Sequence, residues 1–321
     1  KLSSLGDVIH ALPAVHNLKA TSNATVDWLV QPEFAPIVRA CPDVDRVILF
    51  PRRGRWSERW RMVRELRRQR YELAADLQGL LKSAVSMRWA HADCRVGPSF
   101  AREGARWFYD TVTGPTNRNR HSVLEIADLI RWLGWPETPV EFPLRFPAMT
   151  PPGSPPRVAL VPCSRWPTKN WPQDFFRALA ARLIASGITV LILGAERDRP
   201  DTDAIVTGLE PADRVINLAG RTTLEQLGGL LAHVDLAITV DSGPMHLAAA
   251  LGVPVLALFG PTDPVRTGPY GARSRVLTAP PLPCMPCLED HCGRGDHACL
   301  RNIHPSRVAA EVLMMLQRDS H

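Results

Sequence analysis

The 321-residue sequence has no run of about eighteen or more apolar residues, which excludes a membrane-spanning helix. It has none of the glycine-rich patterns GxxxxGKS, GxxxxGKT and GxGxxG, so a P-loop nucleotidase or a conventional dinucleotide enzyme is unsupported. No basic, then apolar, then small-residue leader opens it, and we expect a protein of the reducing cytosol. The first letters, KLSSLGD, lack a complete strand before them, so we expect most of a first β-strand to precede Lys1.

Cysteine is scarce, at seven residues. Three of them, Cys41, Cys94 and Cys163, lie in apolar surroundings and are typical of small buried hydrophobic side chains. The other four lie together in CMPCLEDHCGRGDHACL (284–300), where a C-x2-C pair is followed by two more cysteines. This pattern can bind zinc or an iron–sulfur cluster, and reduced thiols or disulfides are the alternatives. The candidate ligands of a structural metal are Cys284, Cys287, Cys292 and Cys299.

Excess positive charge is confined to one half of the chain. The formal net charge is +6, and all of it falls in residues 1–150, because residues 151–321 are neutral. Much of the excess lies in PRRGRWSERWRMVRELRRQR (51–70), which predicts an arginine-rich helix. Such a helix can present a solvated face, or its arginines can contact phosphate and carboxylate. Because Trp56 and Trp60 share one side of it, nucleic acid, a membrane surface and an anionic lipid head group are all open as partners.

Short apolar runs alternate with helical patterns along most of the chain, which predicts parallel sheets covered by helices on both faces. The stretch EFPLRFPAMTPPGSPP (141–156) has no periodicity and predicts a linker. We therefore expect an α/β protein with two doubly wound, Rossmann-like domains, 1–150 and 151–321, that face each other across a cleft. In the first half we expect strands at 25–30, 46–50 and 72–78.

The second half gives the clearer pattern. Continuous apolar runs predict buried strands, at 157–163, 188–195, 215–220, 236–241 and 253–260. Helices are expected between them, at 172–187, from Thr223 and from Gly243. Because ligands of such sheets bind at the carboxyl ends of the strands, we expect the functional residues in the loops that follow them.

The opening segment KLSSLGDVIHALPA (1–14) predicts a turn that leads into a helix, with Gly6 and Asp7 at the junction. Gly6 lets a ligand approach the backbone closely. A carboxylate at Asp7 is stabilised by the helix dipole. Two roles are open for Asp7. It can be a helix cap without a further function, or it can accept a proton from a substrate hydroxyl as a general base.

A second junction lies in AITVDSGPMHLAAALGVPVLALFGPTDP (237–264), where a buried strand ends at Asp241 and a helix opens at Ser242 and Gly243. The free N–H groups and the positive dipole end of that helix suit a diphosphate, to which Ser242 adds a hydroxyl donor. Gly243 removes a Cβ that would block the approach. His246, one turn further on, can reach the same anion or can be a core histidine. An ordinary turn with good caps is the alternative for the whole motif.

Two further strand ends carry polar residues. In VPCSRWPTKNWP (161–172), Ser164, Thr168 and Lys169 offer two hydroxyls and a cation that can neutralise a phosphate leaving group. The alternative for Lys169 is a solvated lysine beside two structural tryptophans. In LGAERDRPD (193–201), Glu196 or Asp198 stands where acidic groups often bind ribose hydroxyls, and a helix-starting acid is the alternative.

Together these residues resemble the glycosyltransferase family that contains the bacterial lipopolysaccharide heptosyltransferases. The resemblance is carried by KLSSLGDVIHALPA, DLQGLLKSA (76–84), the lysine of TKNWP, the block from TVDSGPMHLAAALG to FGPTDP, and GPYG (268–271). KLSSLGDV and DLQGLLKSA are most similar to heptosyltransferase I. The cysteine-rich tail is similar to heptosyltransferase II-like members, so both assignments stay open.

The resemblance implies a GT-B fold and transfer of L-glycero-D-manno-heptose from ADP-heptose to the Kdo region of inner-core lipopolysaccharide, with inversion and with no cofactor needed for catalysis. Heptosyltransferase II or another core transfer is one alternative, and a non-catalytic nucleotide-binding or lipid-binding module is another. The resemblance makes Asp7 the catalytic base and Lys169 a residue that assists the departing ADP. The implied donor-binding residues are Ser164, Thr168, Lys169, Glu196, Asp198, Asp241, Ser242, Gly243 and His246.

The acceptor, Kdo–lipid A, is assigned to the basic half by the same resemblance. We also expect a peripheral position on the anionic cytoplasmic face of the inner membrane, because of the arginine run, its tryptophans and the pI near 9.2. We expect no nucleic-acid partner. The helix predicted at 304–318 is of the kind that commonly returns to the first domain in GT-B folds. The candidate acceptor contacts are Ser4, Gly6, Arg52, Arg53, Arg55, Gln78, Lys82 and Arg120.

Overall fold

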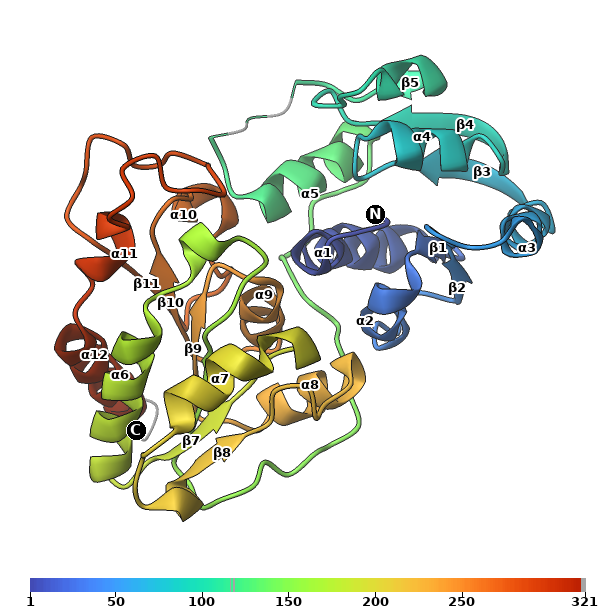
Figure 1. The fold of residues 1–321 in the computed structure, drawn as a ribbon. Coiled ribbons are helices and arrows are strands. Elements are labelled where there is room, and N and C mark those ends of the chain that lie inside the picture. The colour runs from blue at the N-terminus through green and yellow to red at the C-terminus, as the bar shows by residue number, and fades with distance from the viewer. Residues whose placement is uncertain (116, 118, 319–321) are drawn as a thin grey trace. The chain divides into compact units, whose positions relative to one another are not determined.

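The computed structural model describes residues 1–115, 117 and 119–318, and the chain divides into two compact units, Lys1–Arg145 and Phe146–His321 (Figure 1). The division falls inside the proline-rich stretch 141–156, which forms neither helix nor strand. Among the described residues, no helix is both long enough and apolar enough to cross a lipid bilayer.

The second unit is built on one six-stranded sheet whose neighbouring strands are parallel. The strands lie in the order β11-β10-β9-β6-β7-β8. From β6 the chain adds β7 and β8 on one side, then returns and adds β9, β10 and β11 on the other. The strands β6 and β9 therefore flank the switch point of a doubly wound sheet, as expected. The strand bounds are β6 (Arg157–Val161), β7 (Thr189–Ile192), β8 (Val215–Asn217), β9 (Leu236–Val240), β10 (Val255–Phe259) and β11 (Ser274–Thr278).

The helices of this unit begin and end at residues that the sequence marks. One of them follows Pro172 and stops two residues before Gly187, whose φ of +79° suits glycine. Thr223 caps another, because its hydroxyl accepts from the N–H of Gln226 while the Gln226 side chain accepts from the N–H of Thr223. The helix bounds are α6 (Gln173–Ala185), α7 (Arg199–Val206), α8 (Leu224–Leu231), α9 (Gly243–Ala250), α10 (Pro264–Thr267), α11 (Ala298–Arg301) and α12 (Pro305–Arg318), with single 3₁₀ turns at Pro167–Lys169, Glu196–Asp198 and Ala212–Arg214.

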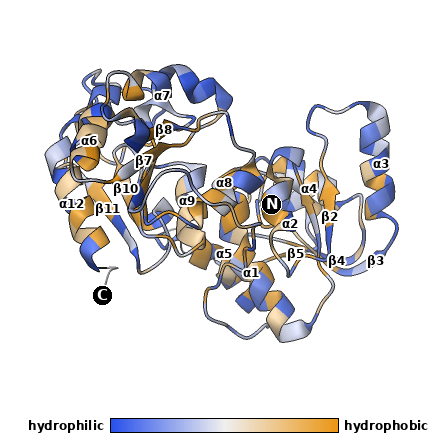
Figure 2. Ribbon diagram, turned by 90° about the horizontal axis from the view of Figure 1, so that it is seen from below, coloured by the Kyte–Doolittle hydropathy of each residue, from blue (hydrophilic) through white to orange (hydrophobic). Residues whose placement is uncertain are grey.

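The core of the second unit lies between its central strands and the covering helices, and Figure 2 shows the apolar character of β10. Leu160, Phe176 and Val190 are fully buried there, and each such side chain stabilises the fold by about 2 kcal/mol. The last helix, α12, packs into the core of the second unit, where Val308 and Val312 are fully buried, because its apolar side contacts α6 and β9. A return of this helix to the first unit stays a prediction.

The first unit divides its strands between two parallel sheets, β1-β2 and β3-β4-β5. A cavity of about 870 Å³ separates them, and residues of β1, β3 and the first helix line it. The strands expected at 25–30, 46–50 and 72–78 are present, and the strand expected before Lys1 stays a prediction. The strand bounds are β1 (Asp27–Val30), β2 (Arg46–Leu49), β3 (Arg70–Ala75), β4 (His91–Gly97) and β5 (Thr111–Val112).

The longest helix of the first unit, α1, packs along α5. Nδ1 of His10 on α1 lies 2.7 Å from Oγ of Ser122 on α5, so a polar contact also joins the two helices. This packing fixes the start of α1, where Asp7 lies. The helix bounds are α1 (Leu5–Ser22), α2 (Ala35–Arg39), α3 (Trp56–Leu66), α4 (Leu81–Met87) and α5 (Ser122–Trp132), with 3₁₀ turns at Pro32–Phe34 and Ala105–Phe108.

Candidate active site

Asp7 lies in the first turn of α1, where its carboxylate closes the start of the helix. Its Oδ2 accepts hydrogen bonds from the main-chain N–H and from the hydroxyl of Ser4, both at 3.0 Å. Groups at a helix start lack partners within the helix, so this contact stabilises α1. The helix-cap role of Asp7 is therefore realised in the structure, and any role as a base is additional to it.

A cation lies beside the same carboxylate. Nζ of Lys1 lies 3.1 Å from Oδ1 of Asp7, and 45% of the Asp7 side chain is exposed. Burial by itself raises the pKa of Asp7, but the charge of Lys1 and the hydrogen bonds from Ser4 lower it by more, so the pKa lies below its ordinary value. Asp7 is thus an ionised carboxylate at neutral pH with an accessible part, which is what a proton acceptor requires.

A buried carboxylate, Asp76, organises the turn that follows β3. Its Oδ1 accepts from the main-chain N–H groups of Gln78 and Gly79, at 2.8 and 3.3 Å. Its Oδ2 accepts from the hydroxyls of Ser83 and Tyr109, at 2.8 and 2.7 Å. Burial and the charge of Asp76 raise the pKa of Tyr109 above its ordinary value, so this hydroxyl stays a donor. Four charge-assisted hydrogen bonds therefore fix the turn.

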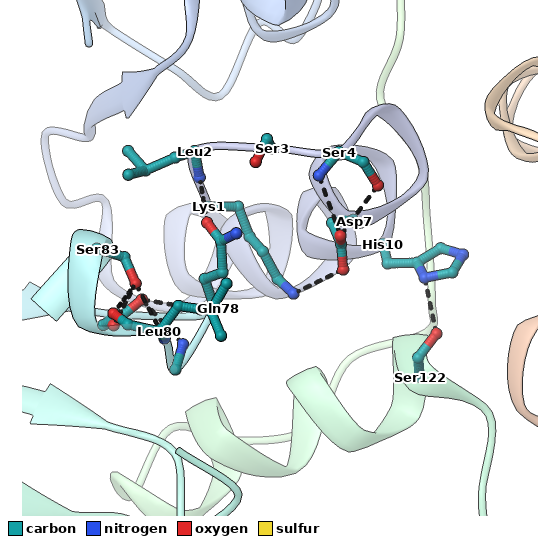
Figure 3. A network of polar contacts seen from close by, with 12 residues as sticks. Lys1, Leu2, Ser3, Ser4, Asp7, His10, Gln78, Leu80, Ser83 and Ser122 are labelled. Atoms are coloured by element: carbon teal, nitrogen blue, oxygen red, sulfur yellow. Dashed lines mark hydrogen bonds and ion pairs between the residues drawn. The ribbon is translucent and has the colours of Figure 1, made fainter. Parts of the chain in front are cut away.

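The turn organised by Asp76 holds the segment that precedes α1 (Figure 3). Oε1 of Gln78 accepts from the N–H of Leu2 at 2.8 Å. The ammonium of Lys82 donates to the hydroxyl of Ser3 at 3.2 Å. Two of the predicted acceptor ligands, Gln78 and Lys82, thus lie against the residues that lead into Ser4 and Asp7. Their contact with an acceptor stays a prediction.

In the second unit, the loops after β6 and β9 meet beside the switch point. Nζ of Lys169 lies 2.7 Å from Oδ2 of Asp241, and both side chains are largely buried. Thr262, which follows β10, donates its hydroxyl to the same Oδ2 at 2.8 Å. The ammonium of Lys169 also lies 4.5 Å from the ring centre of Trp166, in a cation–π contact. The structure thereby brings together two of the predicted donor-binding residues.

The start of α9 adjoins this pair. Oγ of Ser242 is buried, and it has no hydrogen-bond partner among the residues that the structure describes. A buried hydroxyl without a partner is costly, and a ligand oxygen at the N-terminus of the helix would satisfy it. Gly243 is the first residue of α9, and His246 is buried one turn further on. Asp241, Ser242, Gly243 and His246 therefore lie together at this strand end, and their contact with a donor stays a prediction.

The two hydroxyls predicted in the loop after β6 make internal contacts. Ser164 donates to the carbonyl of Trp166 at 2.9 Å. Thr168 is buried, and its hydroxyl donates to the carbonyl of Glu289 at 2.8 Å, in the cysteine-rich segment. Both side chains therefore fix the shape of the loop that carries Lys169, and their contact with a donor stays a prediction.

The two acidic candidates after β7 differ in their surroundings. Asp198 is 14% exposed, and its Oδ2 accepts from the N–H of Ala195 at 2.8 Å, so it caps a 3₁₀ turn. Glu196 is 72% exposed and lies 3.5 Å from the guanidinium of Arg199. The carboxylate of Glu196 is therefore the more accessible of the two.

The basic acceptor candidates do not form one cluster. Arg52 and Arg53 are exposed and line a pocket of about 680 Å³ together with Glu33 and Arg46, whereas Arg55 is exposed before α3. Arg120 pairs with Asp128 at 2.8 Å. Ser4 and Gly6 lie at the start of α1, where Gly6 is buried.

The cysteine-rich segment holds loops of the donor side in place. Besides the contact of Glu289 with Thr168, the N–H of Leu288 donates to the carbonyl of Pro261 at 2.9 Å. Across residues 1–115, 117 and 119–318, no group of three or more His, Cys, Asp or Glu side chains is arranged to hold a metal ion. Cys284, Cys287, Cys292 and Cys299 are free thiols. The described residues thus assemble neither the predicted metal site nor the disulfide alternative.

Three residues of these clusters were given no role from the sequence: Lys1, Asp76 and Thr262. The sequence does offer a sign that Asp76 is important. It is an acidic residue that directly follows a strand, as Asp241 is. Thr262 stands in the quoted FGPTDP segment, but its contact with Asp241 depends on β9 and β10 being neighbours.

Comparison with known proteins covers nearly the whole chain. The family model described as glycosyltransferase family 9 (heptosyltransferase) matches residues 59–297. Lipopolysaccharide heptosyltransferase 1 of Pseudomonas aeruginosa is 34% identical over 98% of this chain and 96% of its own. Two Escherichia coli structures are similar throughout. Heptosyltransferase WaaC with ADP has a TM-score of 0.83 at 28% identity, covering 98% of each chain. ADP-heptose lipopolysaccharide heptosyltransferase II has a TM-score of 0.82 at 26% identity, covering 99% of this chain and 98% of its own. The fold class is the expected GT-B.

Proposed function

The chain belongs to glycosyltransferase family 9, the heptosyltransferases, and we propose that it moves L-glycero-D-manno-heptose from ADP-heptose to the Kdo region of inner-core lipopolysaccharide. It is a glycosyltransferase that acts in lipopolysaccharide synthesis. The observation that carries the finer proposal is the donor side: a lysine, an aspartate and an unpartnered buried hydroxyl gather at the switch point of the second sheet.

For the donor, we assign the diphosphate to the start of α9 and to Lys169. The N–H groups of the helix start, the hydroxyl of Ser242 and the ammonium supply the donors and the charge that a diphosphate needs. We assign the ribose hydroxyls to Glu196 and not to Asp198, because the Asp198 carboxylate already caps a turn. The similar Escherichia coli heptosyltransferase WaaC has been solved with ADP and with ADP-2-deoxy-2-fluoro heptose, which supports an ADP-sugar donor.

For the acceptor, we assign Asp7 as the base. Asp7 takes the proton of an acceptor hydroxyl, and the hydroxyl oxygen forms a bond to the anomeric carbon of heptose from the side opposite the diphosphate. The bond from that carbon to the diphosphate oxygen breaks, its electron pair leaves with ADP, and the configuration inverts. Lys169 and the start of α9 stabilise the charge that develops on the leaving group. The step needs no cofactor.

We propose the first heptose transfer, with Kdo–lipid A as acceptor, and the second transfer as the alternative. The 34% identity to a type 1 enzyme supports the first. Incubation with ADP-heptose and either Kdo–lipid A or the same acceptor carrying one heptose separates the two, since only the correct acceptor is extended. A lipid-linked acceptor also places the enzyme at the cytoplasmic face of the inner membrane.

The test of the mechanism is Asp7→Asn. Asparagine keeps an oxygen that can accept from Ser4, so the helix start is retained while the base is lost. We expect kcat to fall about a hundredfold or more, with ADP affinity unchanged by calorimetry. Asp45→Asn is the matched control, because it removes a carboxylate that pairs with Lys19 in the same unit. Wild-type turnover in Asp7→Asn would refute the assignment of the base.

A further inference from the structure

The helix α3 presents an outer ridge that no described residue of its own unit covers. Trp56 and Trp60 are 76% and 66% exposed, whereas Met62 and Leu66 on the opposite side are buried. At 100° per residue, Trp56, Trp60, Arg64 and Arg67 follow one another along one side of the helix axis. The ridge thus combines two large aromatic rings with guanidinium groups, and α3 is mostly hydrophilic in Figure 2.

Most of the arginines around this ridge have no carboxylate partner among the described residues, although Arg68 and Arg70 do. Residues 52–70 contain nine arginines and two glutamates. Glu58 accepts from the N–H of Arg55, and Glu65 pairs with Arg68 at 3.1 Å, so both acids are engaged. Within the described part of the chain, no carboxylate ion pair is formed by Arg59, Arg61 or Arg64, although Arg59 lies 5.9 Å from the ring centre of Trp56. Guanidinium groups without a carboxylate partner therefore flank the exposed indoles, and Arg64 lies on the same side of the helix as they do.

This combination matches the chemistry of one partner. Indole rings concentrate at the level of lipid head groups, where their apolar part is buried and their N–H stays solvated. A cluster of several arginines on an amphipathic helix binds an anionic leaflet by charge. We propose that the ridge of α3 docks on an anionic phospholipid bilayer, with Trp56 and Trp60 at the head-group level and Arg64 and Arg67 on lipid phosphates. This rests on the proposed function only in that a lipid-linked acceptor lies at the same surface.

The test uses the whole protein and vesicles without any substrate. Sedimentation with vesicles of equal parts phosphatidylcholine and phosphatidylglycerol is compared with vesicles of phosphatidylcholine alone. We expect binding to the anionic vesicles, and a drop of about tenfold in the partition coefficient for Trp56→Ser/Trp60→Ser. Arg64→Gln/Arg67→Gln should lose the preference for the anionic lipid. Trp107→Ser is the matched control, because Trp107 is 91% exposed and lies outside α3.

Two results would overturn the docking proposal. One is equal loss of binding in Trp107→Ser and in the α3 double variant. The other is binding of a single-stranded oligonucleotide without binding of anionic vesicles, which would favour nucleic acid as the partner. Transfer to a soluble, delipidated acceptor separates this proposal from the proposed function. There the Trp56→Ser/Trp60→Ser variant should keep its kcat and donor KM, while Asp7→Asn should not.

Discussion

Lys169 and Asp241 follow different strands, β6 and β9, yet Nζ of the lysine lies 2.7 Å from Oδ2 of the aspartate. The pair is largely buried, and the hydroxyl of Thr262 is a second donor to the same oxygen. A diphosphate bound at the start of α9, as we propose, would therefore compete with Asp241 for the ammonium. We infer that Asp241 fixes the position of Lys169 and lowers the affinity of Lys169 for ADP. A lower affinity favours the release of ADP, which is a product of the reaction.

Lys169→Met separates the two roles of this pair. The variant leaves the buried Asp241 carboxylate with Thr262 alone, and we expect a loss of about 3 kcal/mol in the free energy of unfolding, measured in urea. Adding Asp241→Asn should restore most of that stability, because no unpaired charge remains. The donor KM should stay raised about tenfold in both variants. Recovery of donor affinity in the double variant would contradict a direct contact of Lys169 with ADP.

Removal of the charge beside Asp7 should alter the pH dependence of transfer. Lys1 holds the pKa of Asp7 down, so Lys1→Met should raise that pKa. The acidic limb of a plot of log kcat/KM against pH should then move to higher pH. Because folding lowers this pKa, the carboxylate stabilises the fold above its ordinary pKa, and the effect is lost as pH falls through the lowered value. Lys19→Met, which removes a cation next to Asp45, should leave the acidic limb in place.

The contact between Gln78 and Leu2 should matter for kcat more than for donor binding. Gln78→Met removes the acceptor of the Leu2 N–H and keeps the side-chain length, so the segment that leads to Asp7 should loosen. We expect kcat to fall about tenfold with the donor KM unchanged, and Gln78→Glu, which keeps an acceptor oxygen, to restore it. The exposed Gln69→Met is the control. A Gln78→Glu variant as slow as Gln78→Met would argue against the hydrogen bond.

The cysteines of the 284–300 segment should differ in reactivity. Main-chain N–H groups, that of His297 above all, lower the pKa of Cys292, whereas burial and the neighbouring cysteines raise the pKa of Cys299 to about 11. Since the thiolate is the nucleophile, iodoacetamide at neutral pH should modify Cys292 about tenfold faster than Cys299, as peptide mass spectrometry can measure. Protection of all four cysteines until a chelator is added would show instead that they hold a metal.

Most strands of the second unit could be predicted because buried parallel strands have continuous runs of apolar residues in the sequence. The strands predicted at 188–195 and 253–260 correspond to β7 and β10, which are shorter at both ends than predicted. The edge strand β11 escaped prediction because Ser274 and Arg275 interrupt its apolar character. In the first unit the strand predicted at 72–78 stops at Ala75, because Asp76 turns the backbone through hydrogen bonds to Gln78 and Gly79.

The sequence indicates candidate site residues, but it does not indicate the contacts between them. The turn at Asp241–Gly243 could be recognised because a strand end, a serine and a glycine are adjacent in the sequence. The pairing of Lys169 with Asp241 depends on β6 lying beside β9, a property of strand order that local patterns do not encode. The internal use of Thr168 was unforeseeable for the same reason, since its partner, Glu289, belongs to a distant segment.

Both contacts of the 288–289 segment with the donor-side loops use its main chain, namely the N–H of Leu288 and the carbonyl of Glu289. They reach the residues next to Thr262 and Lys169. Replacing the side chains of Leu288 and Glu289 should therefore leave both hydrogen bonds intact. Adding or deleting one residue after Cys287 would instead move the main-chain groups of 288 and 289 away from their partners. The positions of the loops that carry Lys169 and Thr262 thus depend on the length of the cysteine-rich segment. They tolerate wide variation in its amino-acid sequence.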